Sequence, residues 1–245
     1  MPEASRFPAE PEQSRTSAAA EFDACAGKYA ELLRDPIRDW FASDTGFYLE
    51  RKLALILDFL RSRGLDARHL KWLDVGCGQG LLLKLGQSHF SESAGCDVSE
   101  RMIEACMGLN VCRQESATAL PFPDRSFDLI TAVCVYHHVP VRLRPALTLE
   151  AARVLKSGGV FCVIEHNPLN PIVQIIVSRS PLDANAALVR ARPMKRLLRS
   201  AGMELAGLTY YLYVPARMYA RLACLENRLA RIPLGGQYTV FGRVP

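Results

Sequence analysis

A glycine-rich turn between a strand-like and a helix-like segment is the feature that most restricts how this chain folds. The segment Leu73–Gly80 (LDVGCGQG) follows a short apolar stretch and opens an amphipathic one. Glycine has no Cβ, so such a turn lets the backbone approach a ligand closely. Asp97 ends the next apolar stretch, where a carboxylate can accept hydrogen bonds from both hydroxyls of a ribose. The pattern predicts a nucleoside-type ligand at the carboxyl edge of a sheet.

Strand-like and helix-like segments alternate along the middle of the chain. The strand-like segments are apolar nearly throughout and lack the in–out alternation of a strand with one wet face. Such strands, separated by helices, predict an α/β fold with a parallel sheet buried on both faces. The expected strands are residues 70–75, 93–97, a strand beginning at Val111, 127–135 and 160–165, with 204–214 and 237–244 as an antiparallel C-terminal edge.

The charge of the chain is small but unevenly distributed. The formal net charge is +5, and with 49% hydrophobic and 22% charged residues the composition is that of a globular protein. Residues 171–245 hold 11 basic and three acidic side chains, so the rest of the chain is slightly acidic. A net charge of +5 does not by itself indicate a nucleic-acid-binding protein. The basic last third is instead the first hint about the substrate.

Eight cysteines lack the spacing of a disulfide framework or a zinc site. Most lie in apolar runs such as Val133-Cys134-Val135, where a thiol behaves as a small hydrophobe. We therefore expect free thiols and a cytoplasmic protein. The chain has no apolar run near the roughly 18 residues that span a bilayer, which predicts a soluble protein.

The residues around the loop discriminate between nucleoside cofactors. The dinucleotide-binding pattern is G-x-G-x-x-G, whereas this loop is G-x-G-x-G with Asp74 two residues before it. A carboxylate beside the loop would repel a pyrophosphate but suits an ammonium group. S-adenosylmethionine has that ammonium and no phosphate, so it is the cofactor that this loop favours.

At this point the sequence resembles the class I S-adenosylmethionine-dependent methyltransferases, of the small-molecule, type 11-like kind. The resemblance implies a Rossmann-like, seven-stranded, mostly parallel sheet with helices on both faces and a helical N-terminal cap. Two departures are visible: Ser116 stands where many relatives have Asp, and Ser157 replaces a common Pro. The stretches that carry it, in the expected order, are Asp74–Gly80, Gly95–Ser99, Ser116-Ala117 with Leu120–Phe122, Phe127–Leu129 and Arg153–Gly159.

The resemblance also implies which residues contact the cofactor. It places the methionine moiety over the glycine loop with Asp74 near its ammonium, the ribose at Asp97, and the adenine between Val98 and Ser116-Ala117. The segment Phe22–Tyr29 is similar to an aromatic helix that caps the cofactor in relatives. The full expected set is Asp74, Gly76, Cys77, Gly78, Gly80, Asp97, Val98, Met102, Ser116, Ala117, Cys134 and Tyr29.

Two polar clusters after the fourth and fifth strands are expected to face the methyl acceptor. They are Tyr136-His137-His138 and Glu165–Asn167. A base is needed only when the acceptor must lose a proton, and histidine suits that role near neutral pH. His166 is the first candidate, with Asn167, His138 and His137 beside it. A metal held by the three histidines is conceivable, but the resemblance offers no precedent, so none is expected.

The basic C-terminal third contributes a helix over residues 216–231 and an apolar segment at 171–177. On the helix, Met218, Leu222, Leu225, Leu229 and Ile232 form an apolar stripe, with four arginines off it. Such a helix is a lid over the active site, a helix lying on a membrane surface, or a packed helix with a solvated face. Because arginine suits carboxylate or phosphate groups, an anionic or lipid-linked acceptor would explain both features.

The sequence thus predicts a disordered tail over residues 1–20 and one methyltransferase domain over 21–245. Its core is residues 65–170, and residues 21–64, 171–200 and 215–233 cap the acceptor side. The expected reaction is methyl transfer from S-adenosylmethionine to an O, N or C centre of a small or lipid-linked acceptor. The alternatives are an RNA or protein methyltransferase and a non-catalytic cofactor-binding partner or sensor. The chain carries no RNA-binding module and no signal for an oligomeric state.

Overall fold

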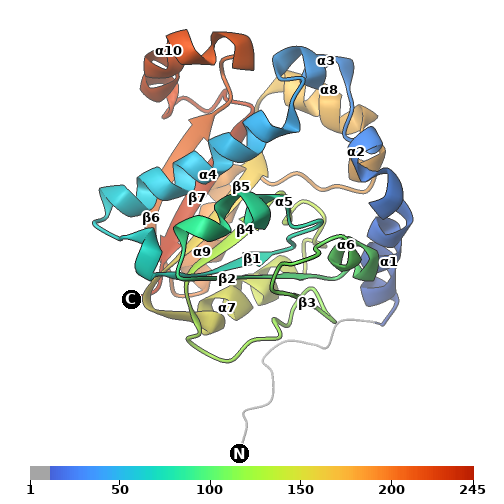
Figure 1. Cartoon of the computed structure of the whole chain (residues 1–245), viewed down its shortest axis with the longest axis vertical. Helices are drawn as coiled ribbons and strands as arrows, with labels where there is room; N and C mark the ends of the chain where they lie inside the picture. The colour runs from blue at the N-terminus through green and yellow to red at the C-terminus, as the bar shows by residue number, and fades with distance from the viewer. Residues whose placement is uncertain (1–11) are drawn as a thin grey trace, which may run out of the picture.

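The computed structural model describes residues 12–245, which form a seven-stranded sheet with helices on both sides (Figure 1). The strand order is β3-β2-β1-β4-β5-β7-β6. β7 is antiparallel to both of its neighbours, and the other pairs are parallel. The predicted fold class, including the antiparallel C-terminal edge, is confirmed. The strands are β1 Lys71–Val75, β2 Glu92–Asp97, β3 Val111–Arg113, β4 Phe127–Val133, β5 Leu155–His166, β6 Glu204–Tyr211 and β7 Gln237–Arg243.

Two apolar clusters fill the space between the sheet and its helices. Neighbouring residues of one strand belong to different clusters: Trp72 packs with the helices of one face and Leu73 with those of the other. Both side chains are fully buried, which explains why the strands show no alternation. Helices α4 and α5 cover one face, and α7 and α9 the other. The helices are α1 Glu12–Cys25, α2 Tyr29–Leu32, α3 Pro36–Phe41, α4 Thr45–Ser62, α5 Leu81–Gly86, α6 Glu100–Glu104, α7 Arg144–Val154, α8 Pro171–Arg179, α9 Ala191–Ser200 and α10 Ala216–Leu229.

The N-terminal part of the chain is more helical than its composition suggested. Residues 12–20 lie in α1, so this part of the expected tail is helical, whereas residues 1–11 lie outside the described residues. Helix α1 packs against α6, and the Asp23 carboxylate accepts hydrogen bonds from the Ser99 hydroxyl at 2.5 Å and the Arg101 N–H at 3.2 Å. These contacts with a distant segment stabilise α1, although its own sequence has no apolar periodicity.

Helix α4 packs on the sheet and carries one unexpected residue. The Asp44 side chain caps it by accepting from the Gly46 N–H at 2.8 Å. Gly64, with a φ of +69°, follows its end. Its buried face holds Leu53, Ile56 and Leu60, and also Lys52, which is only 9% exposed. A lysine on the buried face of a helix needs a polar partner for its ammonium, and the Lys52 Nζ lies 3.9 Å from the Cys134 sulfur.

Helix α10 leaves part of its apolar stripe exposed. It belongs to the segment that links β6 to β7, and its one buried side chain is Glu226. The Glu226 carboxylate lies 2.5 Å from the Arg51 guanidinium and accepts from the Tyr213 and Val214 N–H groups. Met218 is 43% exposed and Leu225 45%. Leu222 and Leu229 of the stripe are half-buried, so the helix packs through Glu226 and one edge of the stripe, and its role stays a prediction.

The eight cysteines carry free thiols, as expected. Among residues 12–245, none of the helices combines the length and the hydropathy that crossing a bilayer requires.

Candidate active site

A cavity of about 390 Å³ lies where β1, β4 and β5 reach their carboxyl ends. Binding sites of open α/β sheets occupy this position, and the volume suits a drug-sized ligand. Residues of α2, α3, α4 and α8 form its outer wall, and the glycine loop forms part of its floor. Of the predicted site residues, those lining the cavity are Tyr29, Asp74, Gly76, Cys77, Gly78, Cys134, His137, His138 and His166.

The three glycines of the loop have different structural roles. All three have positive φ, but a Cβ on Gly76 would lie 2.6 Å from Val135 and one on Gly80 2.5 Å from Leu109. These two glycines permit tight packing of the loop against the protein. A Cβ on Gly78, in contrast, would meet nothing within 4 Å, and Gly78 lines the cavity. Gly78 is therefore the position where the backbone is open to a ligand, and Gly80 does not line the cavity.

Asp74 sits at the end of a buried hydrogen-bond chain. The Trp72 indole N–H donates to the Thr131 hydroxyl at 2.9 Å, and that hydroxyl donates to the Asp74 carboxylate at 2.5 Å. The carboxylate is 3% exposed, and this burial raises the pKa of Asp74 to about 7 despite Thr131 and the nearby Lys52. A buried carboxylate with so little compensation is suited to receive a cationic group from a ligand.

Asp97 supports the loop from behind. Its carboxylate accepts hydrogen bonds from the Gly78 N–H at 2.8 Å and from the Ser99 N–H at 2.9 Å. Burial raises the pKa of Asp97, while these backbone donors oppose the shift. Asp97 does not line the cavity, but Gly78, to which it is bonded, does. Asp97, the residue predicted to contact the ribose, is thus linked to the cavity lining through its hydrogen bond with Gly78.

The residues expected at the adenine lie away from the open cavity. Met102 is fully buried in α6, and Val98 and Ala117 are partly buried. The Ser116 hydroxyl pairs with that of Thr118 at 2.9 Å. None of the four lines the cavity, because α1 packs against α6 on this side of the sheet. Their contact with a cofactor stays a prediction.

Tyr29 and Cys134 line the cavity, and burial shifts the pKa of both, while their contact with a cofactor stays a prediction. Burial raises the pKa of Tyr29 to about 12. Burial also raises the pKa of the Cys134 thiol, but the Lys52 ammonium and His166 bring it down to about 7. The Lys52 Nζ lies 3.9 Å from the Cys134 sulfur, and Cys134 has a φ of +58°. A non-glycine residue held in this conformation at the end of a strand is typical of functional sites.

His137 bridges two carboxylates from different segments. Its Nδ1 lies 2.5 Å from the Glu165 carboxylate and its Nε2 3.3 Å from that of Asp183. Burial lowers the pKa of His137, but the two carboxylates outweigh it and raise the pKa to about 10. His138 lies 3.6 Å from the same Asp183 oxygen, and burial together with positive His137 lowers its pKa to about 4. The ring of His138 also meets that of Phe22 edge-on.

The other two residues predicted to be catalytic have different environments. His166 lines the cavity, with its ring 5.3 Å from that of His137 and its Nδ1 3.5 Å from the Gln237 amide. Asn167 is 1% exposed and does not line the cavity. Its amide donates to the Pro233 and Gly235 carbonyls, and its oxygen accepts from the Leu169 N–H. Asn167 holds the loop before β7 in place, so no polar atom of it is left to face an acceptor.

Sequence reasoning missed three charged residues of the site. Lys52 was detectable, because a lysine among the buried residues of α4 interrupts an apolar stripe. Glu165 was noted in its cluster without a role, since its position beside His137 depends on the pairing of β4 with β5. Asp183 had no signal, because it lies in a short 3₁₀ helix, η4 (Pro181–Asp183), that only tertiary packing brings to the histidines.

Comparison with known sequences matches the core of the chain to one kind of domain. A family model described as a methyltransferase domain matches residues 73–163. The ubiquinone biosynthesis O-methyltransferase of Methylococcus capsulatus is 32% identical over 59% of this chain and 68% of that protein. The uncharacterized methyltransferase YcgJ of Bacillus subtilis is 35% identical over 43% of this chain, spanning 45% of YcgJ. Phosphatidylethanolamine N-methyltransferase of Cereibacter sphaeroides is 36% identical over 41% of this chain and 53% of that protein.

Solved structures share the fold over nearly the whole chain. Magnesium protoporphyrin IX methyltransferase of Synechocystis, solved with bound SAH, aligns with a TM-score of 0.64 over 95% of this chain and 100% of that chain, at 13% identity. A methyltransferase of Thermotoga maritima aligns with a TM-score of 0.61 over 93% of this chain and 100% of that chain, at 19% identity. At these identities the likeness concerns the fold alone.

Proposed function

The chain belongs to the class I S-adenosylmethionine-dependent methyltransferases, and we propose that it methylates a hydroxyl oxygen of an apolar, lipid-linked acceptor that carries an anionic group. The observation that carries this proposal is the lining of one cavity. Asp74 and Gly78 lie at one end of it, histidines at another, and apolar side chains cover it. The cofactor and the acceptor would therefore meet in a space that is largely shielded from water.

The charge of the cofactor end supports the first half of the proposal. S-adenosylmethionine carries an ammonium and a sulfonium group. The Asp74 carboxylate is buried, and its pKa is raised to about 7 because burial outweighs its nearby partners. A bound ammonium would stabilise the ionised form of Asp74. Cofactor binding would thus offset the free-energy cost of burying this carboxylate in the empty site.

The outer wall of the cavity supports an apolar acceptor with an anionic group. Its side chains are mostly large and hydrophobic, and Arg38 is the basic residue among those of α3. The Arg38 guanidinium stacks on the Tyr48 ring, with its carbon 4.8 Å from the ring centroid, and donates to the Leu33 carbonyl at 3.0 Å. A fixed guanidinium of this kind suits a carboxylate or phosphate. The apolar lining residues of this wall are Ile37, Trp40, Phe41, Leu49, Ile172, Val173 and Ile176.

His166 is proposed as the group that accepts the hydroxyl proton. The acceptor oxygen attacks the methyl carbon, and the bond from carbon to the sulfonium sulfur breaks in line. The hydroxyl proton passes to the His166 imidazole, and S-adenosylhomocysteine leaves as the neutral thioether. His166 is preferred to His138, because burial and the positive charge of His137 lower the pKa of His138 to about 4.

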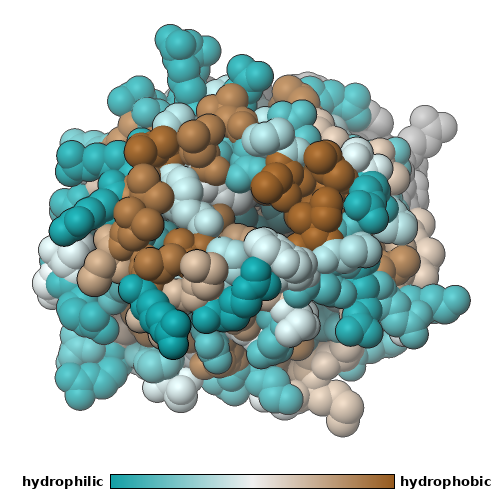
Figure 2. All heavy atoms as spheres, turned by 90° about the horizontal axis from the view of Figure 1, so that it is seen from above, coloured by the Kyte–Doolittle hydropathy of each residue, from teal (hydrophilic) through white to brown (hydrophobic). Residues whose placement is uncertain are grey.

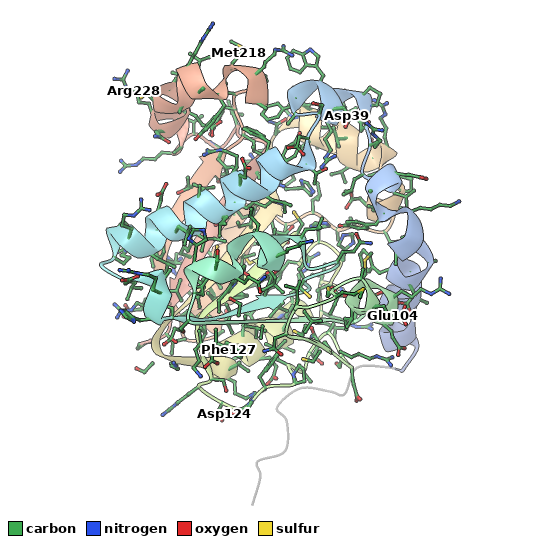
Figure 3. All side chains as sticks on the ribbon, viewed as in Figure 1. Asp39, Glu104, Asp124, Phe127, Met218 and Arg228 are labelled. Atoms are coloured by element: carbon green, nitrogen blue, oxygen red, sulfur yellow. The ribbon has the colours of Figure 1, made fainter. Side chains whose placement is uncertain are left out.

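The mouth of the cavity carries an apolar surface that suits contact with a lipid bilayer. Figure 2 views the end of the molecule that carries α3, α8 and α10, and hydrophobic side chains gather there within a hydrophilic rim. On α10, Met218 and Arg228 point away from the body of the protein (Figure 3). We call this surface the mouth patch. Its exposed apolar members are Trp40, Leu169, Ile172, Ile175, Met218, Leu225, Ile232 and Leu234.

Basic side chains around the mouth patch indicate which surface would cover it. The Arg217 guanidinium lies 4.2 Å from the centroid of the Trp40 ring and joins α10 to α3. The one acidic residue of α10, Glu226, is buried against Arg51. An apolar patch with only positive exposed charges on α10 complements anionic phospholipids. The patch would thus let a lipid-linked acceptor enter the cavity from the bilayer. The other exposed arginines here are Arg179, Arg221, Arg228 and Arg231.

Transfer of a labelled methyl group tests the reaction. The full chain is incubated with S-adenosylmethionine labelled in its methyl group and with either a bacterial lipid extract or the aqueous extract of the same cells. We expect label in the organic phase, in a product that resists mild alkali as an ether does. Label in RNA, in protein or in the aqueous fraction would contradict the proposed acceptor class.

A histidine variant tests the proposed base. His166→Gln should lose methyl transfer while calorimetry still detects S-adenosylmethionine binding, because the residue acts on the acceptor. His89→Gln, which changes an exposed histidine, should leave both unchanged. Full transfer by His166→Gln would show that another group takes the proton.

Vesicle binding tests the mouth patch separately. Met218→Glu should weaken sedimentation with vesicles of phosphatidylglycerol but leave methylation of a detergent-dispersed lipid extract unchanged. Met107→Glu is the matched control, because Met107 is 90% exposed in the loop after α6, away from α10. Equal vesicle binding by the two variants would rule out α10 as a membrane contact, and absence of wild-type binding would rule out the patch.

A further inference from the structure

Three potential metal ligands converge on one point at the inner wall of the cavity. One ring nitrogen of His137, one of His138 and a carboxylate oxygen of Asp183 all lie within 4.8 Å of one another. The Asp183 oxygen is 3.3 Å from His137 Nε2 and 3.6 Å from His138 Nε2. Ligand atoms about 2.1 Å from one ion lie roughly 3.0–3.4 Å apart in octahedral or tetrahedral geometry. The separations in this cluster are close to that range.

Glu165 orients the cluster in the manner of an outer partner of a metal ligand. Its carboxylate lies 2.5 Å from Nδ1 of His137 and accepts from the Tyr136 N–H at 2.7 Å. A proton on Nδ1 leaves Nε2 of His137 directed at Asp183. Histidines that bind metals almost always donate their other N–H to a carboxylate or carbonyl in this way. Glu165 is fully buried, so its arrangement is set by the fold.

Two carboxylates face the histidine ring at the centre of the cluster. Glu165 lies at Nδ1 of His137 and Asp183 at its Nε2. Two carboxylates beside neutral imidazoles would be offset by one divalent cation. Buried charges that are paired cost far less free energy than unpaired ones.

We propose that His137, His138 and Asp183 bind a divalent transition metal ion. Two imidazoles and one carboxylate favour borderline ions such as Zn²⁺, Fe²⁺ or Mn²⁺ over Mg²⁺. All three residues line the cavity, so the remaining coordination positions face the space for the acceptor. There the ion would hold the acceptor hydroxyl and lower its pKa. This catalytic role rests on the proposed methyl transfer, whereas metal binding itself does not.

Titration of the metal-free protein tests the site without turnover. The full chain is stripped with EDTA, dialysed, and titrated with Co²⁺ by absorbance and with Zn²⁺ by calorimetry. We expect one saturable equivalent, d–d absorption without a thiolate-to-cobalt band, and no displacement by Mg²⁺. His138→Gln and Asp183→Asn should each weaken binding by more than about tenfold, and Glu165→Gln by about 10–100-fold.

Two controls make the result decisive. His89→Gln removes an exposed histidine outside the cluster and should bind metal like the wild type. S-adenosylmethionine binding, measured by calorimetry, shows that a variant is folded. If the wild type does not bind S-adenosylmethionine, the proposed function is wrong, and the metal titration still tests the metal site. Three results would overturn the proposal. They are a lack of saturable binding, metal affinities of His138→Gln and Asp183→Asn that equal that of the wild type, and a thiolate band from Cys134 or Cys224.

Discussion

The two ends of the cavity balance their buried charges in opposite ways. At the proposed cofactor end, Asp74 in the cavity lining and Asp97 behind the glycine loop lie among hydroxyl and backbone donors, and burial raises the pKa of both. At the acceptor end, burial would also raise the pKa values of Glu165 and Asp183, but their contacts with His137 lower them. The first end thus has negative charge that awaits a cation from a ligand. The second end carries its own partner, because His137 contacts both of its carboxylates.

The largest effect is expected where the partnered charges are separated. Glu165→Ala removes the carboxylate that contacts Nδ1 of His137 and accepts from the Tyr136 N–H, which leaves these two buried groups without an acceptor, and Asp183 as the one carboxylate on His137. We expect a loss of about 3–5 kcal/mol in the free energy of unfolding. Urea denaturation measures it. Glu104→Ala, at an exposed position on α6, should change the stability by less than about 0.5 kcal/mol. Similar losses in both variants would show that the acceptor end is not interlocked.

At the proposed cofactor end, removing a charge should raise the free energy of unfolding instead of lowering it. Asp74 has its pKa raised from 3.8 to about 7, so folding favours its protonated form, and this contribution is lost as pH rises through 7. Asp74→Asn mimics the neutral form. It should therefore stabilise the empty protein by on the order of 2–4 kcal/mol at pH 8 and have little effect near pH 4. Thermal unfolding at both pH values provides the measurement. Destabilisation at pH 8 would mean that Asp74 already has an adequate partner.

The same carboxylate predicts how cofactor affinity depends on pH. Because a bound ammonium needs ionised Asp74, S-adenosylmethionine should bind more weakly as pH falls below 7, by up to about tenfold per pH unit. Calorimetry from pH 5 to pH 8 measures this dependence. Asp74→Asn should bind more weakly at pH 8 and lose the dependence. A flat profile for the wild type would remove Asp74 from the ammonium site.

The smallest expected effect separates ligand approach from backbone strain. Gly78→Ala places a methyl group at a positive φ in open space beside the cavity, and Gly108→Ala does the same in the loop between α6 and β3. Each should cost about 1–2 kcal/mol of stability. Only Gly78→Ala should weaken S-adenosylmethionine binding, by about tenfold or more. Equal affinities of the two variants would show that the cofactor does not approach Gly78.

Local patterns were sufficient for the core of the fold and for one end of the site. Apolar segments such as residues 127–133 had no alternation, which required a sheet buried on both faces. The spacing of the loop glycines identified the turn. All three have positive φ, and a Cβ on Gly76 or Gly80 would also lie too close to a neighbouring side chain. Asn167 shows the limit of this reasoning. It followed a strand where acceptor contacts are expected, yet its amide is used by carbonyls more than 60 residues away in the chain.

By itself, the sequence determined the buried strands of a mostly parallel sheet and the glycine turn after the first of them, since both follow from short-range periodicity and glycine spacing. Only the tertiary structure decided how the charges meet. Asp183 reaches His137, and Lys52 reaches Cys134, across 46 and 82 positions of the chain. It also left Met218 and Leu225 of α10 exposed, because buried Glu226 pairs with Arg51 of α4. Such pairings depend on long-range packing, which no local pattern of residues encodes.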